Sequence, residues 1–464
     1  MFVGRKKELL RLQQLYDNEK FQCTVIYGRR RVGKTTLIRE FIKDKKTIYF
    51  AGLETTEQNN LENFSKSIFE LSMEGNAVPT FQSFSDAFSY LGGVAQKERI
   101  ILVIDEFPYL ANAVKGISSI LQKYIDLELM ESKLFIILCG SSMSFMENQV
   151  LGYQSPLYGR RTAQFKIEPF DFFEMRLFYH SFSIYDLALI YGIMGGIPQY
   201  LQKIDENSSM KDNITLQYLT SDAYLFEEPS NLLKQELREP QIYNAVITAI
   251  ANGSSKLNEI STKVGLTSSA AIQYLTSLMS LGIVKKEYPI TEKKSKKTIY
   301  ALADNMFRFW YRFIPKYNSI IQKGFGEKVY SSIELELNEY MGAVFEEICM
   351  QYLWKLFEMG KLPFEFEDVG RWWGNNPKKK VEQEIDILAY CDTSAIFGEC
   401  KWRNELFDVD IYLQLKEKSD LFFYENKYFY LFSKSGFTNK MKELAMKDER
   451  IILIGMDNIE NQQN

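Results

Sequence analysis

A glycine-rich loop between an apolar segment and a helical segment restricts most strongly what this chain can fold into. The loop reads Gly28-Arg29-Arg30-Arg31-Val32-Gly33-Lys34-Thr35 and continues into Thr36 and further helix-forming residues. Two glycines separated by four residues and followed by lysine and threonine match the phosphate-loop pattern at every fixed position. The pattern predicts a strand, a loop that binds nucleotide phosphates, and a helix.

Each residue type in this loop has a physical reason. The glycines let backbone amides turn toward the β-phosphate. Lys34 brings a mobile cation to the β- and γ-phosphates, and Thr35 offers a hydroxyl to Mg²⁺. The helix that begins there adds the positive end of its dipole. We therefore expect ATP and Mg²⁺ to bind along residues 28–36.

Short apolar segments of strand length recur through the first third of the chain. They lie at residues 21–27, 47–51, 100–104, 134–139 and 163–167, and helical stretches separate them. Strands that are apolar on both faces are typical of parallel sheets buried under helices. The alternation of strands and helices therefore predicts an α/β fold with a parallel sheet.

Polar side chains follow two of these strands and precede a third. The strand at 100–104 ends in Asp105 and Glu106, which predicts that Asp105 holds Mg²⁺ through water and that Glu106 polarises the attacking water. Ser141 follows the fourth strand and either senses the γ-phosphate or forms a plain turn. Arg160 and Arg161 precede the fifth strand. Arg160 either supplies a cation to the transition state or belongs to a basic surface pair.

Five segments together resemble the archaeal-type ATPases of the AAA-like and signal-transducing (STAND) branch of P-loop proteins. They read Phe-Val-Gly-Arg-x-x-Glu-Leu from residue 2, the phosphate loop, Ile-Leu-Val-Ile-Asp-Glu-Phe, Leu-Tyr-Gly-Arg-Arg and Gly-Gly-Ile-Pro-Gln-Tyr-Leu. The resemblance extends to about residue 230. It implies that Arg5 lies near the adenine and that Pro198, in a helical lid, closes on the nucleotide.

Composition excludes several classes of protein. A net charge of −4 argues against a uniformly basic nucleic-acid-binding surface, although it allows a local basic patch. The single histidine excludes a His-rich metal site, and five cysteines without a CxxC pair indicate reduced thiols. There is no signal-peptide core and no apolar run of the roughly 18 residues that span a membrane. We expect a cytoplasmic protein without membrane contact, and leave self-association into a homo-oligomer open.

Residues 239–304 contain three helical segments followed by two short strands, which predicts a winged helix. The hairpin between the strands carries six lysines, Lys285, Lys286, Lys293, Lys294, Lys296 and Lys297. A basic hairpin of this kind can hold a DNA backbone. The third helix, at 268–281, has no arginine or lysine, which argues against base reading. DNA and a protein partner both stay open.

A predicted hairpin near the C-terminus brings acidic residues together. Two apolar strands flank a turn at residues 392–393, and pairing across it places Asp386 opposite Glu399 and Glu384 opposite Lys401. Two carboxylates and a lysine on one face can hold Mg²⁺ and activate water for phosphodiester hydrolysis. The alternative is a salt-bridge ladder without chemistry. Repulsion between facing acids favours the metal site.

This hairpin resembles the PD-(D/E)XK nuclease superfamily, which has an acid on one strand and Glu-x-Lys on the next, in a mixed sheet flanked by helices. The resemblance implies that Lys401 positions the nucleophile. It also implies metal ligands on both strands and on the first helix of the domain, namely Asp386, Glu399, the carbonyl of Cys400, and Glu346. Ile385 stands where the superfamily pattern has proline.

Upstream of the hairpin, aromatic and basic residues predict either a nucleic-acid grip by charge and stacking or a solvated loop. They are Arg371, Trp372, Trp373, Lys378, Lys379 and Lys380.

These features divide the chain into five expected segments. They are a P-loop core at 1–168, a helical lid at 169–238, a winged helix at 239–304, a helical connector at 305–340 and a nuclease-like α/β domain at 341–464. The expected function is a Mg²⁺-dependent ATPase coupled to a domain that binds and cleaves DNA. The alternative is a nucleotide-switched regulator or scaffold whose nuclease-like domain is not catalytic.

Overall fold

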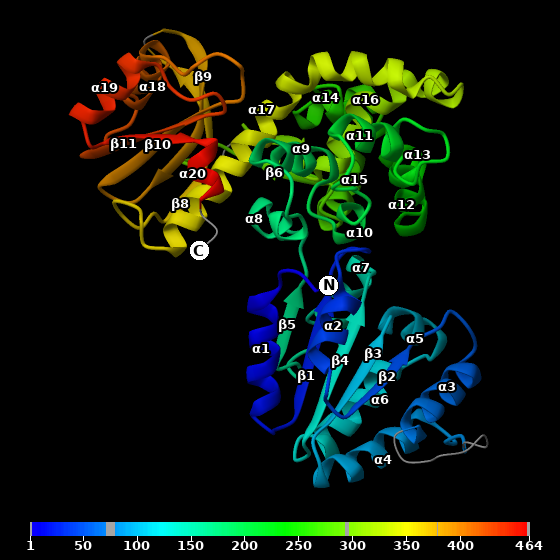
Figure 1. Ribbon diagram of the computed structural model, residues 1–464. Coiled ribbons are helices and arrows are strands. Elements are labelled where there is room, and N and C mark those ends of the chain that lie inside the picture. The colour runs from blue at the N-terminus through cyan, green and yellow to red at the C-terminus, as the bar shows by residue number, and fades with distance from the viewer. Residues whose placement is uncertain (1, 71–78, 293–296, 378, 462–464) are drawn as a thin grey trace. The chain divides into compact units, whose positions relative to one another are not determined.

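The computed structural model describes residues 2–70, 79–292, 297–377 and 379–461 (Figure 1). The chain forms two compact units, one of residues 1–170 with 197–199 and one of residues 171–196 with 200–464. The first is a parallel α/β unit, and the second combines helices with a separate mixed sheet. The predicted α/β class is therefore confirmed. No helix in the described ranges is long and apolar enough to cross a membrane.

A five-stranded parallel sheet forms the core of the first unit. Its order is β2-β3-β4-β1-β5. The strands are β1 (Gln22–Tyr27), β2 (Thr47–Ala51), β3 (Ile100–Asp105), β4 (Leu134–Gly140) and β5 (Ala163–Lys166). All residues of β1, β3 and β4 are buried, whereas the edge strands β2 and β5 alternate between buried or half-buried and more exposed positions. The continuously apolar segments are thus the central strands, as expected for a sheet covered on both faces.

Helices cover this sheet and lead into the second unit. Those of the first unit are α1 (Lys6–Asp17), α2 (Lys34–Ile42), α3 (Glu57–Phe69), α4 (Phe84–Lys97), α5 (Phe107–Ala113), α6 (Ile117–Tyr124) and α7 (Met143–Phe145), with the π-helical turns η1 (Ile125–Leu129) and η2 (Met146–Val150). The lid segment contains α8 (Phe172–Met175), the 3₁₀ turn η3 (Arg176–Phe178), α9 (Ile184–Met194), α10 (Pro198–Leu201), α11 (Met210–Tyr218) and α12 (Glu228–Glu236).

The expected winged-helix segment has three helices followed by a small antiparallel sheet. Its elements are α13 (Pro240–Ala251), α14 (Leu257–Val264), α15 (Ser268–Ser280), β6 (Val284–Glu287) and β7 (Ile299–Leu302). Ala271, Leu275 and Leu278 form the buried side of α15, whereas Ile272 is 45% exposed and does not share that side. The tip of the hairpin, with Lys293, Lys294 and Lys296, lies outside the described residues.

Two long helices follow, α16 (Asn305–Gln322) and α17 (Gly326–Glu358). The expected boundary at 340/341 falls inside α17, which continues unbroken for 33 residues. The five-segment division stays a prediction, but no loop marks its last boundary. Buried apolar side chains extend along α17 from Val329 to Leu356, so packing rather than a linker determines where this helix lies.

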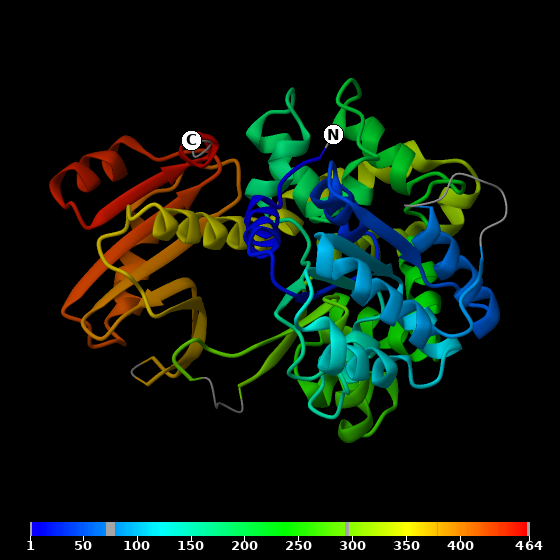
Figure 2. The same ribbon diagram turned by 90° about the horizontal axis from the view of Figure 1, so that it is seen from below.

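A five-stranded mixed sheet completes the chain, in the order β12-β11-β10-β9-β8. The strands are β8 (Asp368–Asn376), β9 (Val381–Tyr390), β10 (Ser394–Lys401), β11 (Asn426–Ser433) and β12 (Ile451–Gly455), with helices α18 (Val409–Ser419), α19 (Asn439–Lys447) and α20 (Met456–Glu460). In the β9–β10 hairpin Gly398 pairs with Ile387. This register places Glu399 beside Asp386, as the sequence predicts. Figure 2 shows α17 passing along this sheet.

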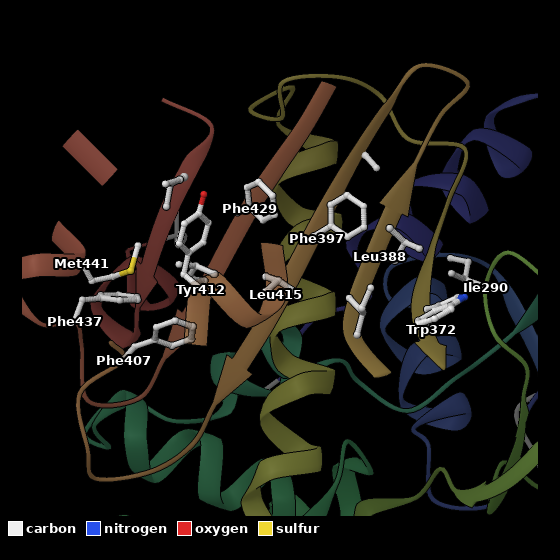
Figure 3. Packing of buried hydrophobic residues seen from close by; sticks show 14 residues of the cluster. Ile290, Trp372, Leu388, Phe397, Phe407, Tyr412, Leu415, Phe429, Phe437 and Met441 are labelled. Carbon is white, nitrogen blue, oxygen red and sulfur yellow. The ribbon is translucent and has the colours of Figure 1, made fainter. Parts of the chain in front are cut away.

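The opposite face of the mixed sheet carries an apolar cluster (Figure 3). Phe397 and Phe429 stack at its centre with ring centroids 6.0 Å apart, and Tyr412 and Leu415 of α18 pack over them. Ile290, which follows β6 in the winged-helix hairpin, is also part of the cluster and is only 4% exposed. The C-terminal core is therefore built partly from a segment some hundred residues earlier in the chain.

Phe397→Ala tests this core. Truncation of a fully buried phenylalanine costs about 3–5 kcal/mol, so the C-terminal unfolding transition should move to lower urea. Tryptophan fluorescence during urea unfolding measures the shift. Phe423→Ala is the matched control, because Phe423 is fully exposed and its loss should change stability by no more than about 0.5 kcal/mol. Equal effects of the two variants would contradict the assignment of the core.

Candidate nucleotide and metal sites

The phosphate loop connects β1 to α2 in a conformation that needs glycine. A Cβ on Gly28 would lie 2.4 Å from the carbonyl oxygen of Ile167, so no side chain fits there. Arg31 and Gly33 have positive φ angles of 71° and 91°. Alternating backbone conformations of this kind turn successive N–H groups toward one point and form an anion-binding concavity. The loop thus has the shape that the sequence predicts for binding phosphates.

Lys34 lies at the first turn of α2 and is buried. Its ammonium group donates hydrogen bonds to the carbonyl oxygens of Gly28, at 2.9 Å, and of Arg29, at 3.0 Å. The lysine therefore folds back across the loop. Its charge lies where the loop amides converge, which suits recognition of β- and γ-phosphates. Val32 is fully buried within the loop.

The end of β3 faces the start of α2 and provides oxygen ligands for a cation. The hydroxyl of Thr35 donates to Oδ2 of Asp105 at 3.2 Å, and the hydroxyl of Tyr49 donates to the same oxygen. Burial and this hydrogen bond raise the pKa of Tyr49. Hydroxyl and carboxylate oxygens are ligands that Mg²⁺ prefers, so the pair Thr35 and Asp105 fits the ion. No motif in the sequence points to Tyr49.

Glu106 lies one residue further, at the N-terminal end of α5, in the left-handed conformation with a φ of 47°. Non-glycine residues with positive φ are strained and are common at functional sites. Both carboxylate oxygens accept a hydrogen bond from the Ser141 hydroxyl at 3.0 Å. Glu106 and Ser141 are therefore joined at the carboxyl ends of neighbouring strands β3 and β4, beside Asp105.

Two residues implied by the family resemblance also lie against the loop. The Arg5 guanidinium stacks over the Phe170 ring, 4.2 Å from its centroid, and donates to the Val32 carbonyl at 3.3 Å. A Cβ on Gly33 would lie 3.6 Å from the Pro198 ring. Arg30 donates to the Tyr109 hydroxyl at 3.0 Å. Arg5 and Pro198 are thus neighbours of the phosphate loop, and their predicted roles near the adenine and in closing on the nucleotide stay predictions.

Arg160 is not brought to this site. It forms a bidentate ion pair with Asp126 at 2.9–3.0 Å. Two residues later the Thr162 amide donates to the Cys23 carbonyl, at the amino end of β1. The phosphate loop follows the other end of β1, about 13 Å away at the rise of a β-strand. Within one chain Arg160 therefore lies at the end of β1 that is away from the phosphate loop.

The second candidate site lies where β9 and β10 run side by side. Asp386 accepts a hydrogen bond from the Cys400 amide at 2.8 Å, so in this structure Cys400 contributes its N–H. Glu399 is 6% exposed and pairs with two ammonium groups. Lys401 lies 2.6 Å from one of its oxygens and Lys418 of α18 lies 3.2 Å from the other. Lys418 had no sequence signal, because α18 follows the hairpin by an irregular connection.

Arg371 connects this site to three other acids. It lies at a β-bulge in the pairing of β8 with β9. Gly370 pairs with Leu388 and Trp372 pairs with Ile385, so Arg371 lies opposite both Asp386 and Ile387. Its guanidinium is 3.5 Å from a carboxylate oxygen of each of its partners, which are Glu287 of β6, Glu346 of α17 and Glu384 of β9. Arg371 therefore forms ion pairs with acids of the winged-helix hairpin, of α17 and of the strand that carries Asp386.

Burial and crowded negative charge alter the ionisation of the cluster. Burial, then Glu399 and then Glu346 raise the pKa of Asp386 from 3.8 to about 7. Burial also raises the pKa of Glu346. Burial lowers the pKa of Lys401, but Glu399 and Asp386 offset this effect and leave it raised. Carboxylates that resist ionisation together fit a site that a divalent cation would neutralise.

The donor chemistry fits a hard cation such as Mg²⁺, which prefers carboxylate oxygens. In the described part of the chain, however, no three acidic, cysteine or histidine side chains converge closely enough to hold a metal ion. Asp386, Glu399 and Lys401 are adjacent. Glu346 pairs with Arg371, which lies opposite Asp386 on the neighbouring strand. Their role as metal ligands stays a prediction.

Of the two alternatives that the sequence left open for the segment upstream of the hairpin, a solvated loop is wrong for residues 371–373. Residues 368–376 form strand β8, not a loop. Trp372 is 7% exposed and packs on Phe422 at 5.0 Å, so it belongs to the core and is not available for stacking. Lys379 pairs with Glu417 at 2.7 Å, and Lys378 lies outside the described residues. Trp373 is partly exposed.

The raised pKa of Asp386 predicts a pH effect in metal-free buffer. Between pH 4 and 7 the folded chain holds a proton on Asp386 that the unfolded chain releases. The stability due to this proton is present below pH 4 and is lost as pH rises to about 7. Asp386→Asn should therefore raise Tm relative to the wild type by a few degrees at pH 8 and by much less at pH 4.

Thermal unfolding across this pH range measures the difference. Asp392→Asn, in the exposed turn of the same hairpin, is the control and should shift Tm equally at all pH values. A constant difference between Asp386→Asn and the wild type would contradict the prediction.

Comparison with family models matches both parts of the chain. The model described as an ATPase domain predominantly from Archaea matches residues 2–204. The model described as "Archaea bacterial proteins of unknown function" matches residues 310–419, which include α17 and the β9–β10 hairpin.

Individual relatives agree with these matches. An uncharacterized protein of Methanocaldococcus jannaschii is 35% identical over 427 residues, 91% of this chain and 92% of that protein. An uncharacterized ATP-binding protein of Pyrococcus abyssi is 35% identical over 77 residues, 16% of this chain and 23% of that protein. A Walker-type ATPase of Pyrococcus abyssi shares the fold, with a TM-score of 0.51 and 19% identity over 67% of this chain and 96% of its own. The chain therefore belongs to the archaeal-type family of ATP-binding P-loop ATPases that carry a C-terminal domain of unknown function.

Proposed function

We propose that ATP binding and Mg²⁺-dependent hydrolysis by the first unit control a metal-dependent centre in the C-terminal domain that cleaves phosphodiester bonds in DNA. The observation that carries the proposal is the group formed by Asp386, Glu399 and Lys401. These three residues are buried or half-buried, and the hairpin holds them side by side. A ladder of facing acids without a cation would be repulsive.

In the ATPase, each residue has a role that follows from its position. Lys34 and the loop amides bind the β- and γ-phosphates, while Thr35 and Asp105 would hold Mg²⁺, which neutralises phosphate charge when bound. Glu106 is placed to orient and polarise the attacking water. Its hydrogen bonds to Ser141 support a role for the serine in sensing whether the γ-phosphate is present.

In the C-terminal centre, Asp386, Glu399 and the carbonyl of Cys400 would hold a divalent cation, which lowers the pKa of water and stabilises charge on phosphate. Lys401 is half-buried against Glu399, so its ammonium group is oriented rather than mobile. A fixed ammonium beside two carboxylates can position the attacking water. Glu346 supplies a further carboxylate from α17.

Helix α17 supports coupling between the lid and this centre. Its Tyr340 hydroxyl donates to the Gly192 carbonyl of α9, and Glu347 accepts from the Tyr191 hydroxyl at 2.8 Å. Gln351 accepts from the Phe172 amide of α8 at 2.8 Å. The chain continues from α9 through the Gly-Gly turn to Pro198. A shift of the lid on nucleotide binding would therefore reach the helix that carries Glu346.

A second function is favoured by the ammonium groups around Glu399. Lys401 and Lys418 already neutralise this carboxylate. Such ion pairs can stabilise the fold without a metal ion. The chain would then act as a nucleotide-switched regulator or scaffold, and the C-terminal domain would bind a partner without cleavage.

Glu106→Gln tests the ATPase roles. The amide keeps the shape of the side chain but cannot act as a base, so ATP binding should persist and turnover should fall by about 10²-fold or more. Lys34→Ala should instead weaken ATP binding by at least about tenfold, since a hydrogen bond to a charged group is lost. Fluorescent-nucleotide binding and phosphate release measure the two effects. Glu131→Gln, an exposed acid of the same unit, should match the wild type. Full turnover by Glu106→Gln would contradict the role of Glu106 in polarising the attacking water.

Metal-dependent cleavage separates the two functions. With Mg²⁺ or Mn²⁺, the full chain should cut plasmid or single-stranded DNA, and Asp386→Ala and Lys401→Ala should each abolish cutting. Lys34→Ala should still cut but without response to ATP. Asp392→Ala, an exposed acid in the same hairpin, should behave like the wild type. No cleavage of any DNA or RNA by the wild type would favour the regulator instead.

A further inference from the structure

A cavity of about 330 Å³ opens between the winged-helix hairpin, α17 and β8. Among the residues that line it are Lys285, Lys286 and Tyr288 from the hairpin, Glu346 from α17, and Arg371 and Trp373 from β8. Three segments far apart in the sequence therefore form one pocket. Its volume is at the lower end of the range of pockets that bind small organic ligands.

This pocket adjoins the candidate metal site. Glu346 and Arg371 line the pocket and also form the ion pair that borders Asp386, 3.5 Å from nitrogen to oxygen. A molecule in the pocket would consequently lie next to the carboxylates that are placed to hold a cation. A pocket in this position is suited to hold part of the substrate on which that centre acts.

The side chains around the pocket suit a nucleotide. The Trp373 indole is held by a hydrogen bond from its ring N–H to the Lys297 carbonyl at 3.2 Å, so its ring is already oriented. Tyr288 is 40% exposed. Aromatic faces of this kind stack with bases of any sequence, and nearby cations attract phosphate. Lys286 is exposed, and Lys285 and Arg371 are both paired with Glu287.

The hairpin also limits what can enter. The Ile290 amide donates to the Arg371 carbonyl at 3.0 Å, and the Ile290 side chain is buried in the C-terminal core. These contacts hold the hairpin over β8, which is the edge strand of the sheet. A base that is paired and stacked inside a duplex cannot enter a pocket of about 330 Å³, so the pocket suits a base that is unpaired.

We propose that this pocket binds a single unpaired nucleotide of a nucleic-acid strand and thereby makes single-stranded nucleic acid the preferred substrate. The proposal rests on the cleavage function proposed above and names its substrate class. The base stacks between Tyr288 and Trp373, and the exposed ammonium group of Lys286 attracts the phosphate. The winged-helix hairpin acts as a wall of the pocket and not as a clamp on duplex DNA.

Fluorescence anisotropy with the full-length protein in EDTA tests binding without cleavage. The probes are a fluorescein-labelled single-stranded oligodeoxynucleotide, the same sequence as RNA, and a blunt hairpin duplex. The wild type should bind both single strands more tightly than the duplex. Trp373→Ala should weaken single-strand binding by about tenfold, the size expected for one lost stack, and Trp373→Phe should restore most of it.

Phe423→Ala is the matched control, since it removes a fully exposed aromatic side chain far along the chain from the pocket residues. It should leave binding unchanged. Tyr288→Ala, a surface change in the hairpin, provides a second variant if Trp373→Ala disturbs folding. It should weaken single-strand binding in the same direction.

The outcomes separate the pocket from the cleavage function. Binding to single strands that depends on Trp373 and Tyr288, in a protein that cleaves nothing, would support the pocket and refute cleavage. Cleavage that favours duplex and is unaffected by Trp373→Ala and Tyr288→Ala would support the proposed function and overturn the pocket. If Trp373→Ala weakens binding of the DNA oligonucleotide but not of the RNA oligonucleotide, the pocket binds deoxynucleotides.

Discussion

Helix α17 is the element on which the second unit depends. Its buried side chains, from Val329 to Leu356, are covered by neighbours along most of its 33 residues. Most of the stability of a helix in a protein comes from tertiary packing and not from its own propensity, so this burial holds α17 in place. Residues 340, 347 and 351 hydrogen-bond to the lid helices, while Glu346, one position away, faces the acid cluster. One rigid element therefore connects the parts on which both proposed activities rely.

The charges around Asp386 are balanced by groups of the chain itself. Arg371 neutralises Glu346 and Glu384, and Lys401 and Lys418 neutralise Glu399. Buried carboxylates cannot all stay ionised without such partners. A divalent cation in the cluster would compete with these ammonium and guanidinium groups for the same carboxylate oxygens. These basic residues therefore occupy the carboxylate oxygens that the proposed metal would need, and Arg371 also pairs with Glu287 of the winged-helix hairpin.

Much of the fold could be predicted from local pattern. The central strands are continuous apolar runs, and the β9–β10 register follows from a short turn with apolar flanks, so the sequence alone predicts that Asp386 lies beside Glu399. Contacts between distant segments have no comparable local pattern in the sequence. Nothing in the sequence near Asp105 indicates Tyr49, and nothing near Glu399 indicates Lys418. Of the two alternatives left open for this segment, stacking by Trp372 is excluded because its side chain is buried. The bulge between Gly370 and Trp372 has no sequence pattern that would have revealed this.

The hairpin that covers β8 has a consequence for how this chain can be divided. The family match to the C-terminal part begins inside α16 and stops at residue 419, before β11 and β12. A fragment cut at those limits would lack two strands of the sheet and the buried Ile290, and would expose an open strand edge of the kind that aggregates. The segment that the C-terminal family model matches is thus smaller than the segment that must be kept together for the sheet to fold. Gene fusions that transplant this domain would need to carry the hairpin with it.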